Sequence, residues 1–375
     1  MRRVADGSAS LGRWDRWYEA PWWLRQADAM TIYAAKFREE EEVEYDRRLV
    51  ETLDGGVVAL DVVRSAGGRA PAELDGRAPF GLLVSGLGGG SQDAYVRNMA
   101  AALVRAGCCV GVLNMRGCGG SPVRTPRLFS AYRGSTDDVR VGVRYVRQQL
   151  LGGGSAGEEG DVLLVGWSNG ATIVANALAE QTTRHGKGHD PRWTRANAGA
   201  ILAAPYDMPR STEHLEGKLF QRLIYNRLVT RSLARQFKPH THLFNKGPVP
   251  RWLDDVPDVS VDVDLLMGAQ TIRDVDEAIT RKVFGYESVD DYYFHASCYQ
   301  RLQHVDVPLL MVSAADDPMS TGWIPIEEVR ENRNLLLAYT EHGGHLGWQD
   351  AENCGRSDWA EQAVVDFFRA AVQQS

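Results

Sequence analysis

The sequence predicts an α/β fold in which a mostly parallel β-sheet is flanked by helices and interrupted by an inserted helical lid. Short apolar runs without alternation, which are typical of strands covered on both faces, occur at 80–86, 108–115, 162–166 and 198–204. Helical patterns separate these runs, and this alternation is typical of βαβ units in a parallel sheet. One long segment, 206–299, breaks the alternation.

Each element follows from a local pattern. Two strand-like runs surround Asp54-Gly55-Gly56 within residues 47–63, which predicts a β-hairpin before the alternating region. Apolar residues at helical spacing then predict helices over 93–106, 138–150 and 171–180. After the interruption the predicted elements are a strand, a short helix, a strand and a final helix, at 308–314, 324–330, 334–339 and 358–371.

The interruption divides the chain into four parts. We expect an N-terminal extension over 1–45, the first part of the core over 46–205, a lid or cap over 206–299, and the second part of the core over 300–375. The segment 206–299 is polar, helical in places and rich in Arg and Asp. Because it falls between strand ends, we expect it to lie above one edge of the sheet.

Bulk properties exclude some classes of partner. The 375 residues carry a net charge of −7, whereas a nucleic-acid surface needs a basic field that neutralises phosphates. The five cysteines are odd in number and lack metal-type spacing, which indicates a reduced intracellular compartment. No apolar stretch reaches the ~18 residues of a transmembrane helix. We therefore expect a cytoplasmic protein with no nucleic-acid partner, although Arg, Ser and Ala near the N-terminus leave organellar targeting open.

The first chemical signal is the pentapeptide Gly166-Trp167-Ser168-Asn169-Gly170. It matches G-x-S-x-G directly after a predicted strand and before a predicted helix, which is the context of a nucleophile elbow in the α/β-hydrolase fold. A sharp strand-to-helix turn holds Ser168 in a strained conformation, and the two flanking glycines let strand and helix approach closely. The alternative is an ordinary Gly/Ser turn, but the acid and histidine that follow favour a nucleophile.

An acid and then a base must follow the nucleophile along the chain in this fold. Asp316 and Asp317 come just after the predicted strand 308–314. We favour Asp317, which directly precedes a proline, and keep Asp316 as the fallback; a solvated turn acid is the alternative for either. His345 lies in a Gly-Gly-His-Leu-Gly-Trp stretch after the next strand and is the predicted base, whereas His342 is interpreted as a polar loop residue.

Two backbone N–H groups are needed to stabilise the oxyanion that develops during acyl transfer. One should be that of Asn169, and the other that of Leu87, in the glycine-rich loop 85–91. This loop lacks the Lys-Ser/Thr end of a phosphate-binding loop. The chemistry requires no metal and no organic cofactor, and no third ligand is obvious for the pair His240 and His242.

Short motifs along the chain match one known family. They are Ser85-Gly86-Leu87-Gly88-Gly89-Gly90-Ser91, Tyr95-Val96-Arg97, Asn114-Met115-Arg116-Gly117-Cys118-Gly119-Gly120-Ser121-Pro122, Thr125-Pro126-Arg127-Leu128-Phe129-Ser130-Ala131, Thr271-Ile272-Arg273-Asp274 with Asp276, Phe284-Gly285-Tyr286 and Asp291-Tyr292-Tyr293. Together they resemble the YheT-like α/β-hydrolases, which include bacterial hydrolases, plant embryogenesis-associated proteins and animal α/β-hydrolase-domain lipases. The resemblance extends from about Trp22 to Phe368.

The resemblance implies carboxylic-ester hydrolysis, with acylglycerols or phospholipids among the family's substrates. It also implies that the catalytic triad is Ser168, Asp317 and His345. This chain departs from the family at three places: Ser85 replaces a usual His, Asn169 replaces a usual apolar residue, and the segment 26–31 lacks a His that many members carry. Animal members often have an N-terminal membrane anchor, which this sequence does not show.

The sequence therefore predicts a serine esterase or lipase that acts on acyl esters or lipids, with two alternatives. His345 and Asp350 form H-x-x-x-x-D, a spacing seen in acyltransferases, so acyl transfer to an alcohol is the first alternative. The second is a non-catalytic binding protein, because one scaffold hosts many functions. That alternative predicts a broken triad, whereas all three positions are filled.

Within the segment 206–299 an apolar stripe predicts a helix that covers an acyl pocket. The stripe comprises Leu215, Leu219, Leu223, Leu233 and Phe237, and it is flanked by Lys218, Arg222, Arg227, Arg231 and Arg235. An apolar stripe with basic flanks can cover a lipid-binding pocket or rest on an anionic membrane surface. We therefore expect peripheral membrane contact through the lid; the alternative is a helix packed on the core with a solvated basic rim.

Overall fold

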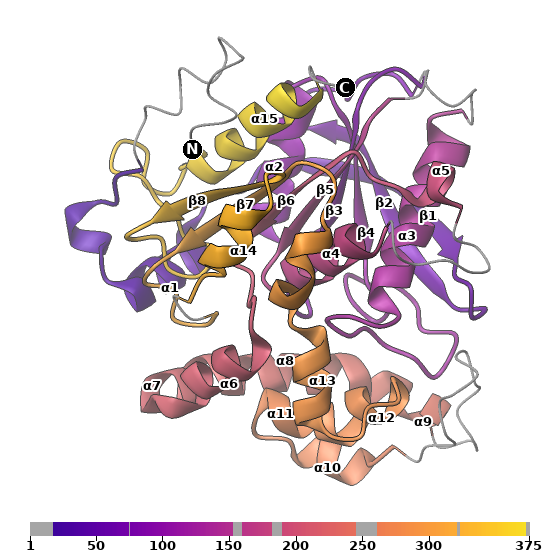
Figure 1. The fold of residues 1–375 in the computed structure, drawn as a ribbon, viewed down its shortest axis with the longest axis vertical. Helices are drawn as coiled ribbons and strands as arrows, with labels where there is room; N and C mark the ends of the chain where they lie inside the picture. The colour runs from indigo at the N-terminus through magenta and orange to yellow at the C-terminus, as the bar shows by residue number, and fades with distance from the viewer. Residues whose placement is uncertain are drawn as a thin grey trace.

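A computed structural model describes residues 18–74, 76–152, 160–181, 190–244, 261–320 and 323–372 of the chain. The described residues form one eight-stranded sheet, flanked by helices (Figure 1). Part of the expected extension over 1–45 and part of the expected lid over 206–299 lie outside these residues. No helix within the described ranges is both long and apolar enough to cross a bilayer.

The sheet confirms the predicted α/β fold. Its strands are β1 (Val43–Glu51), β2 (Val57–Ala66), β3 (Phe80–Val84), β4 (Cys109–Asn114), β5 (Val162–Trp167), β6 (Ala198–Leu202), β7 (Leu309–Ala314) and β8 (Leu335–Thr340), in the spatial order β1-β2-β4-β3-β5-β6-β7-β8. The hairpin β1–β2 pairs antiparallel, as does β2 with β4, and every other pair is parallel. Strands β3 to β7 are buried along their whole length, which explains why they read as unbroken apolar runs.

Helices cover both faces of the sheet. They are α1 (Ala27–Phe37), α2 (Ala94–Arg105), α3 (Ser135–Tyr145) with a π-helical extension (Val146–Leu150), α4 (Asn169–Glu180), α5 (Pro191–Thr194), α14 (Ile326–Glu331) and α15 (Trp359–Val372). Apolar side chains of α2 and α15 share one core cluster with one face of the sheet, and those of α3 and α4 share the other. The core is therefore a three-layer sandwich whose central layer is the sheet.

The chain between β6 and β7 forms a further group of helices, which we call the insertion (208–304); its last helix, Cys298–His304, packs against α4 of the core. Its elements are α6 (Met208–Gly217), α7 (Leu219–Gln221), a π-helical turn (Arg222–Asn226), α8 (Arg227–Phe237), a 3₁₀ turn (Lys238–His240), α9 (Thr241–Phe244), α10 (Val263–Gly268), α11 (Ile272–Val275), a π-helical turn (Asp276–Thr280), α12 (Arg281–Val283), α13 (Val289–Ala296) and a 3₁₀ helix (Cys298–His304). Figure 1 shows α6 to α13 gathered at one end of the molecule, beyond the sheet. The break in the strand–helix rhythm after Pro205 thus marks a real change in architecture.

The predicted apolar stripe over the pocket is wrong in its details. Helix α6 ends at Gly217, and Lys218 has an extended backbone with φ −107° and ψ 133°, so the stripe is split between two helical segments. Leu219 and Leu223 are 64% and 46% exposed, whereas Leu233 and Phe237 are buried. Helical spacing alone did not reveal that this segment carries one apolar stripe facing inward and a second one facing outward.

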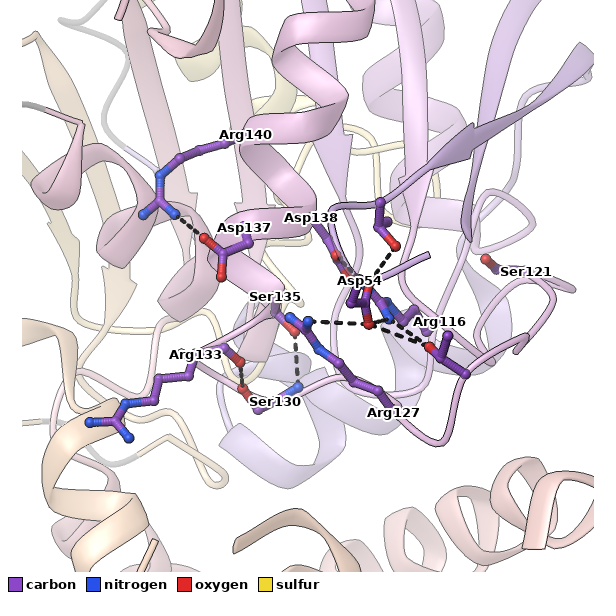
Figure 2. A network of polar contacts seen from close by, with 12 residues as sticks. Asp54, Arg116, Ser121, Arg127, Ser130, Arg133, Ser135, Asp137, Asp138 and Arg140 are labelled. Carbon is purple, nitrogen blue, oxygen red and sulfur yellow. Dashed lines mark hydrogen bonds and ion pairs between the residues drawn. The ribbon is translucent and has the colours of Figure 1, made fainter. Parts of the chain in front are cut away.

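A buried network of charges ties the hairpin turn to the core (Figure 2). Arg116 follows β4 and is only 1% exposed, and its guanidinium makes two-pronged hydrogen bonds with Asp54 of the β1–β2 turn and with Asp138 of α3. Arg127 adds a further ion pair to Asp54 at 3.3 Å. Burial alone raises the pKa of Asp54, but Arg116 and Arg127 hold that pKa well below its ordinary value.

Removing the central cation of this network is expected to destabilise the fold strongly. Arg116→Met leaves the buried carboxylate of Asp138 without its cation and that of Asp54 with Arg127 alone, which costs about 3–5 kcal/mol in the free energy of unfolding. Urea unfolding at neutral pH measures this loss. Because the pKa of Asp54 is lowered on folding, its ionised form adds to the free energy of unfolding above the ordinary carboxyl pKa, and this stabilisation is lost as the pH falls. The difference in the free energy of unfolding between wild type and variant therefore becomes smaller in acid.

The matched control lies on the same hairpin. Arg48 forms an exposed pair with Asp46, and such surface pairs contribute about 0–1 kcal/mol. Arg48→Met should therefore unfold close to the wild-type urea midpoint. Equal midpoints for Arg116→Met and Arg48→Met would contradict the structural role of the buried network.

Candidate active site

The sheet topology brings the predicted site residues to one edge. The strand order changes direction between β3 and β5, and ligands of parallel α/β sheets bind beyond the carboxyl ends of strands at such a switch point. Ser168 follows β5 and the glycine-rich loop 85–91 follows β3, so the two segments are neighbours. The insertion leaves and re-enters the sheet at the same carboxyl ends, after β6 and before β7.

Ser168 occupies the sharp turn between β5 and α4. Its backbone has φ 51° and ψ −121°, a region that residues with side chains seldom adopt. A Cβ atom at Gly170 would lie 2.2 Å from the carbonyl oxygen of Ser85, and one at Gly166 would lie 2.5 Å from that of Gly170. Only glycine fits at these two positions, so the local sequence accounts for the strained geometry of the serine.

Ser168, His345 and Asp317 form one chain of hydrogen-bonding groups. His345 Nε2 lies 3.0 Å from Ser168 Oγ, and His345 Nδ1 lies 2.8 Å from Asp317 Oδ2. An ionised carboxylate only accepts hydrogen bonds, so His345 Nδ1–H donates to it and Nε2 is left free to accept the serine proton. The structure therefore brings together the three side chains predicted to act as nucleophile, base and acid.

The environment of Asp317 differs from that of Asp316. Asp317 is buried, and its Oδ1 accepts hydrogen bonds from the backbone N–H groups of Met319 (2.8 Å) and Ser320 (2.9 Å). Asp316 points elsewhere: its Oδ1 accepts the N–H of Gly344 at 2.9 Å, and its Oδ2 lies 3.5 Å from Nδ1 of His342. Burial raises the pKa of Asp316. The two aspartates thus serve different partners, and the geometry favours Asp317 as the partner of His345.

The residues that carry the two predicted oxyanion donors lie beside the serine. Leu87 and Asn169 line a cavity together with Ser168 and His345. Among the residues that the structure describes, neither backbone N–H of Leu87 and Asn169 has an acceptor. An unpaired N–H beside a nucleophile can stabilise an oxyanion. Asn169 is the first residue of α4, where the positive end of the helix dipole also favours negative charge.

The cavity has a volume of about 410 Å³, which falls in the range of small-molecule pockets. Its walls come from the loop after β3, from Ser168 and His345, and from the insertion. The apolar lining residues are Leu87, Pro205, Met208, Leu215, Val229, Ile272, Met319 and Leu346. Polar and charged groups, among them Glu216, Asn226, Ser232 and Arg273, line the insertion side, and Asp93 lines the side of the glycine-rich loop. The site therefore pairs a nucleophile with a mostly apolar chamber. No group of metal-ligating side chains occurs in the described parts of the chain.

The sequence did not reveal that the N-terminal segment holds the histidine loop. Thr31 on α1 is buried, and its Oγ1 accepts the backbone N–H of His345 at 2.9 Å. Arg38, just after α1, donates from its guanidinium to the carbonyls of Leu346 and Gly347, the latter at 2.8 Å. Leu346 has a positive φ of 60°, so these contacts hold a strained loop. No local signal could have shown them, because 314 positions separate Thr31 from His345.

A second unpredicted pair shapes the glycine-rich loop. Tyr95 on α2 accepts the N–H of Gly86 at 3.1 Å and donates to Asp93 Oδ2 at 2.9 Å. The same carboxylate oxygen accepts the N–H of Gly90 at 3.0 Å. Burial and the neighbouring Asp93 raise the pKa of Tyr95, so its hydroxyl stays protonated. The pair fixes the backbone on both sides of Leu87, one of the two predicted oxyanion donors.

Thr31 is expected to act as a positioning residue for His345. Thr31→Val keeps the shape of the side chain but removes the oxygen that accepts the His345 N–H. The hydroxyl also donates to the Ala27 carbonyl within α1, but only its bond to His345 bears on the base. Loss of that one bond, about 1.4 kcal/mol, corresponds to roughly a tenfold lower kcat. Initial-rate kinetics on a soluble ester should show the loss in kcat with little change in KM. Thr31→Ser, which retains the oxygen, should restore most of the rate; a Ser variant as slow as the Val variant would exclude this role.

Most of the chain matches the model of one protein family. Residues 82–354, which include all five predicted site residues, match the family model described as "Alpha/beta hydrolase family". The chain belongs to this family. The fold, and the order in which Ser168, Asp317 and His345 are predicted to supply nucleophile, acid and base, are those expected of its members.

Relatives of this hydrolase confirm the narrower resemblance seen in the sequence. It is 32% identical to the embryogenesis-associated protein EMB8 of Picea glauca over 342 residues, which cover 90% of this chain and 68% of that protein. It is 28% identical to the human phospholipase ABHD3 over 352 residues, covering 94% and 78% of the two chains. It is also 28% identical to a monoacylglycerol lipase of Saccharomyces cerevisiae over 290 residues, covering 76% and 58%.

Solved structures support the fold. The esterase Est1E from Butyrivibrio proteoclasticus, with ferulic acid bound, superposes with a TM-score of 0.51 at 13% identity, covering 87% of this chain and 99% of that chain. At this identity the likeness concerns the fold of the hydrolase and not its substrate.

Proposed function

We propose that this hydrolase cleaves carboxylic esters, with acylglycerols, phospholipids or shorter acyl esters as substrates, through an acyl-enzyme on Ser168. One observation carries the proposal: Ser168 Oγ lies 3.0 Å from His345 Nε2, His345 Nδ1 lies 2.8 Å from Asp317, and this chain of groups opens on a mostly apolar cavity. The names of the relatives, a phospholipase and a monoacylglycerol lipase, support the same reaction class.

The geometry gives each group a role in two half-reactions. Ser168 Oγ attacks the ester carbonyl while His345 Nε2 takes its proton, and Asp317 stabilises the imidazolium. The N–H groups of Leu87 and Asn169 receive the developing oxyanion. His345 then protonates the departing alcohol, which leaves an acyl group on Ser168. Water attacks that acyl group with His345 again acting as the base, and the free acid and the serine are released.

The lining of the cavity favours an acyl chain over a polar acid. Leu215 on α6, Val229 on α8 and Ile272 on α11 place apolar side chains of the insertion opposite the serine. Burial of methylene groups in such a chamber contributes about 0.8 kcal/mol each. We therefore propose that the insertion serves as a lid over the acyl pocket. Because long-chain esters reside in lipid phases, the proposal also calls for contact between the insertion and a lipid surface.

A series of p-nitrophenyl esters of increasing chain length tests this function, with Ser168→Ala protein as the blank. We expect turnover of the esters and a kcat/KM that rises with chain length. Val229→Trp fills the pocket and should lower kcat/KM on long chains by about tenfold or more, while acetate hydrolysis changes little. Leu49→Trp is the control, because Leu49 on β1 is 48% exposed and is not among the residues that line the cavity. No turnover of any ester would reject the proposal, and equal losses on all chain lengths would reject the acyl pocket.

Acyl transfer to an alcohol is a second candidate, supported by one relative. A Saccharomyces cerevisiae protein named medium-chain fatty acid ethyl ester synthase/esterase 2 is 28% identical over 301 residues, covering 77% of this chain and 62% of that protein. The H-x-x-x-x-D spacing does not add support, because Asp350 accepts hydrogen bonds from the N–H groups of Glu352 and Asn353 and from the hydroxyl of Ser357. Adding ethanol and measuring ethyl ester against free acid distinguishes the two reactions.

A further inference from the structure

The outer side of the insertion carries an unusual surface. The twenty residues 218–237 contain five cations and no Asp or Glu, in a chain whose net charge is −7. Five apolar side chains of the same stretch are largely exposed: Leu219 (64%), Phe220 (45%), Leu223 (46%), Ile224 (37%) and Leu228 (60%). Together with Lys218, Arg222, Arg227, Arg231 and Arg235, which are all exposed, they form what we call the docking face.

The docking face lies on helices whose opposite side is buried or lines the cavity. Thr230, Leu233 and Phe237 are buried, and Asn226 and Val229 line the cavity. The spacing of the exposed apolar residues is helical, at positions 219, 220, 223, 224 and 228. One helical stretch thus has an inward face that builds the pocket and an outward apolar face that the fold leaves uncovered. Figure 1 shows α7 at the left-hand end of the insertion.

The cations of the docking face also have no acidic partners among the described residues. Within the described part of the chain, none of the five forms an ion pair. Exposed arginines elsewhere do have acidic partners, as Arg48 has Asp46 and Arg330 has Glu327. A group of unpaired cations around exposed leucines and a phenylalanine creates a positive field next to an apolar stripe.

We propose that the docking face binds the surface of an anionic lipid bilayer, with its apolar side chains among the acyl chains and its cations on the headgroups. A helix with an apolar face and a Lys/Arg-rich polar face binds membranes in this way. A second copy of the chain fits less well, because a two-fold contact between docking faces would set the five cations against five others. When the docking face is bound to the bilayer, the helices that form the wall of the pocket lie against the lipid phase that holds the ester.

The proposal that the docking face brings the enzyme to its lipid substrate rests on the proposed function, but the test of membrane binding requires no catalysis. Ser168→Ala protein is mixed with vesicles of phosphatidylcholine alone or with phosphatidylglycerol added, and the bound fraction is measured by co-sedimentation. We expect binding to the anionic vesicles that weakens as salt is raised, and weak binding to neutral vesicles. Failure of the ester assay with intact vesicle binding would reject the enzyme and not the docking face.

Variants separate the two components of binding. Arg222→Glu with Arg231→Glu should lower the partition coefficient by about 25-fold or more, since each cation near an anionic surface contributes about fivefold. Leu219→Ser with Leu223→Ser should lower it by at least about tenfold. Both double variants should retain wild-type turnover of a soluble acetate ester when Ser168 is present, because these side chains are not among those that line the cavity.

Matched controls lie on the hairpin at the far edge of the sheet, where Arg64 is exposed and Leu49 is 48% exposed. Arg64→Glu and Leu49→Ser should bind vesicles as the parent does. Three results would overturn the proposal: no binding of the parent to anionic vesicles, equal binding by parent and double variants, or a dimer in sedimentation that Leu219→Ser with Leu223→Ser converts to a monomer.

Discussion

Ser168→Ala is expected to lower kcat on any ester substrate by roughly five to six orders of magnitude, because it removes the group that we propose forms the acyl bond. The residue sits at the turn between β5 and α4 with its Oγ 3.0 Å from His345 Nε2. A fluorophosphonate probe should label the wild-type protein at Ser168 and leave the variant unlabelled. Circular dichroism and the urea midpoint should change little, since alanine is smaller and adopts the same backbone without new contacts.

The effect should be non-additive with loss of the base. His345→Ala alone, and the double variant Ser168→Ala with His345→Ala, should each retain about the same residual rate as Ser168→Ala, because the two groups act as one unit. Double-variant losses equal to the product of the single losses would argue that Ser168 and His345 act in separate steps. Probe labelling that survives Ser168→Ala would place the nucleophile elsewhere.

The parts of the site that follow from short motifs could be predicted from the sequence. A nucleophile elbow depends on residues 166–170 and on the flanking strand and helix, all of which are local. The order Ser, Asp, His along the chain then limited the acid to two neighbouring residues and the base to one histidine loop. The strands that carry these residues were predictable because burial on both faces leaves a continuous apolar run.

Contacts between distant segments could not be predicted in the same way. Thr31 meets His345 only because the segment before β1 packs beside the loop after β8, at the opposite end of the sequence. The expectation that 1–45 is merely an extension therefore missed its contact with the histidine loop. In the insertion, helical spacing showed apolar residues without showing which side faces inward, because Gly217 ends one helix and the next segment has two apolar faces.

Asp317→Asn is expected to lower kcat by about four orders of magnitude, as for the corresponding change in a serine protease. The structure gives the reason. The N–H groups of Met319 and Ser320 both donate to Oδ1, so the amide oxygen of an asparagine will occupy that position. Its NH₂ group then replaces Oδ2, 2.8 Å from His345 Nδ1. Nδ1 must now accept a hydrogen bond, the proton moves to Nε2, and the imidazole can no longer take the proton of Ser168.

Asp316→Asn is the matched control, one position away. Asp316 accepts the N–H of Gly344 through a single oxygen, which an asparagine also supplies, and its other oxygen lies near His342 rather than His345. Its kcat should fall by no more than about tenfold. Because Asp317→Asn acts through the tautomer of His345, its loss of kcat should come with little change in KM, and NMR of the ring nitrogens should show the proton on Nε2. A severe loss in Asp316→Asn with near-normal turnover in Asp317→Asn would reverse the assignment of the two carboxylates.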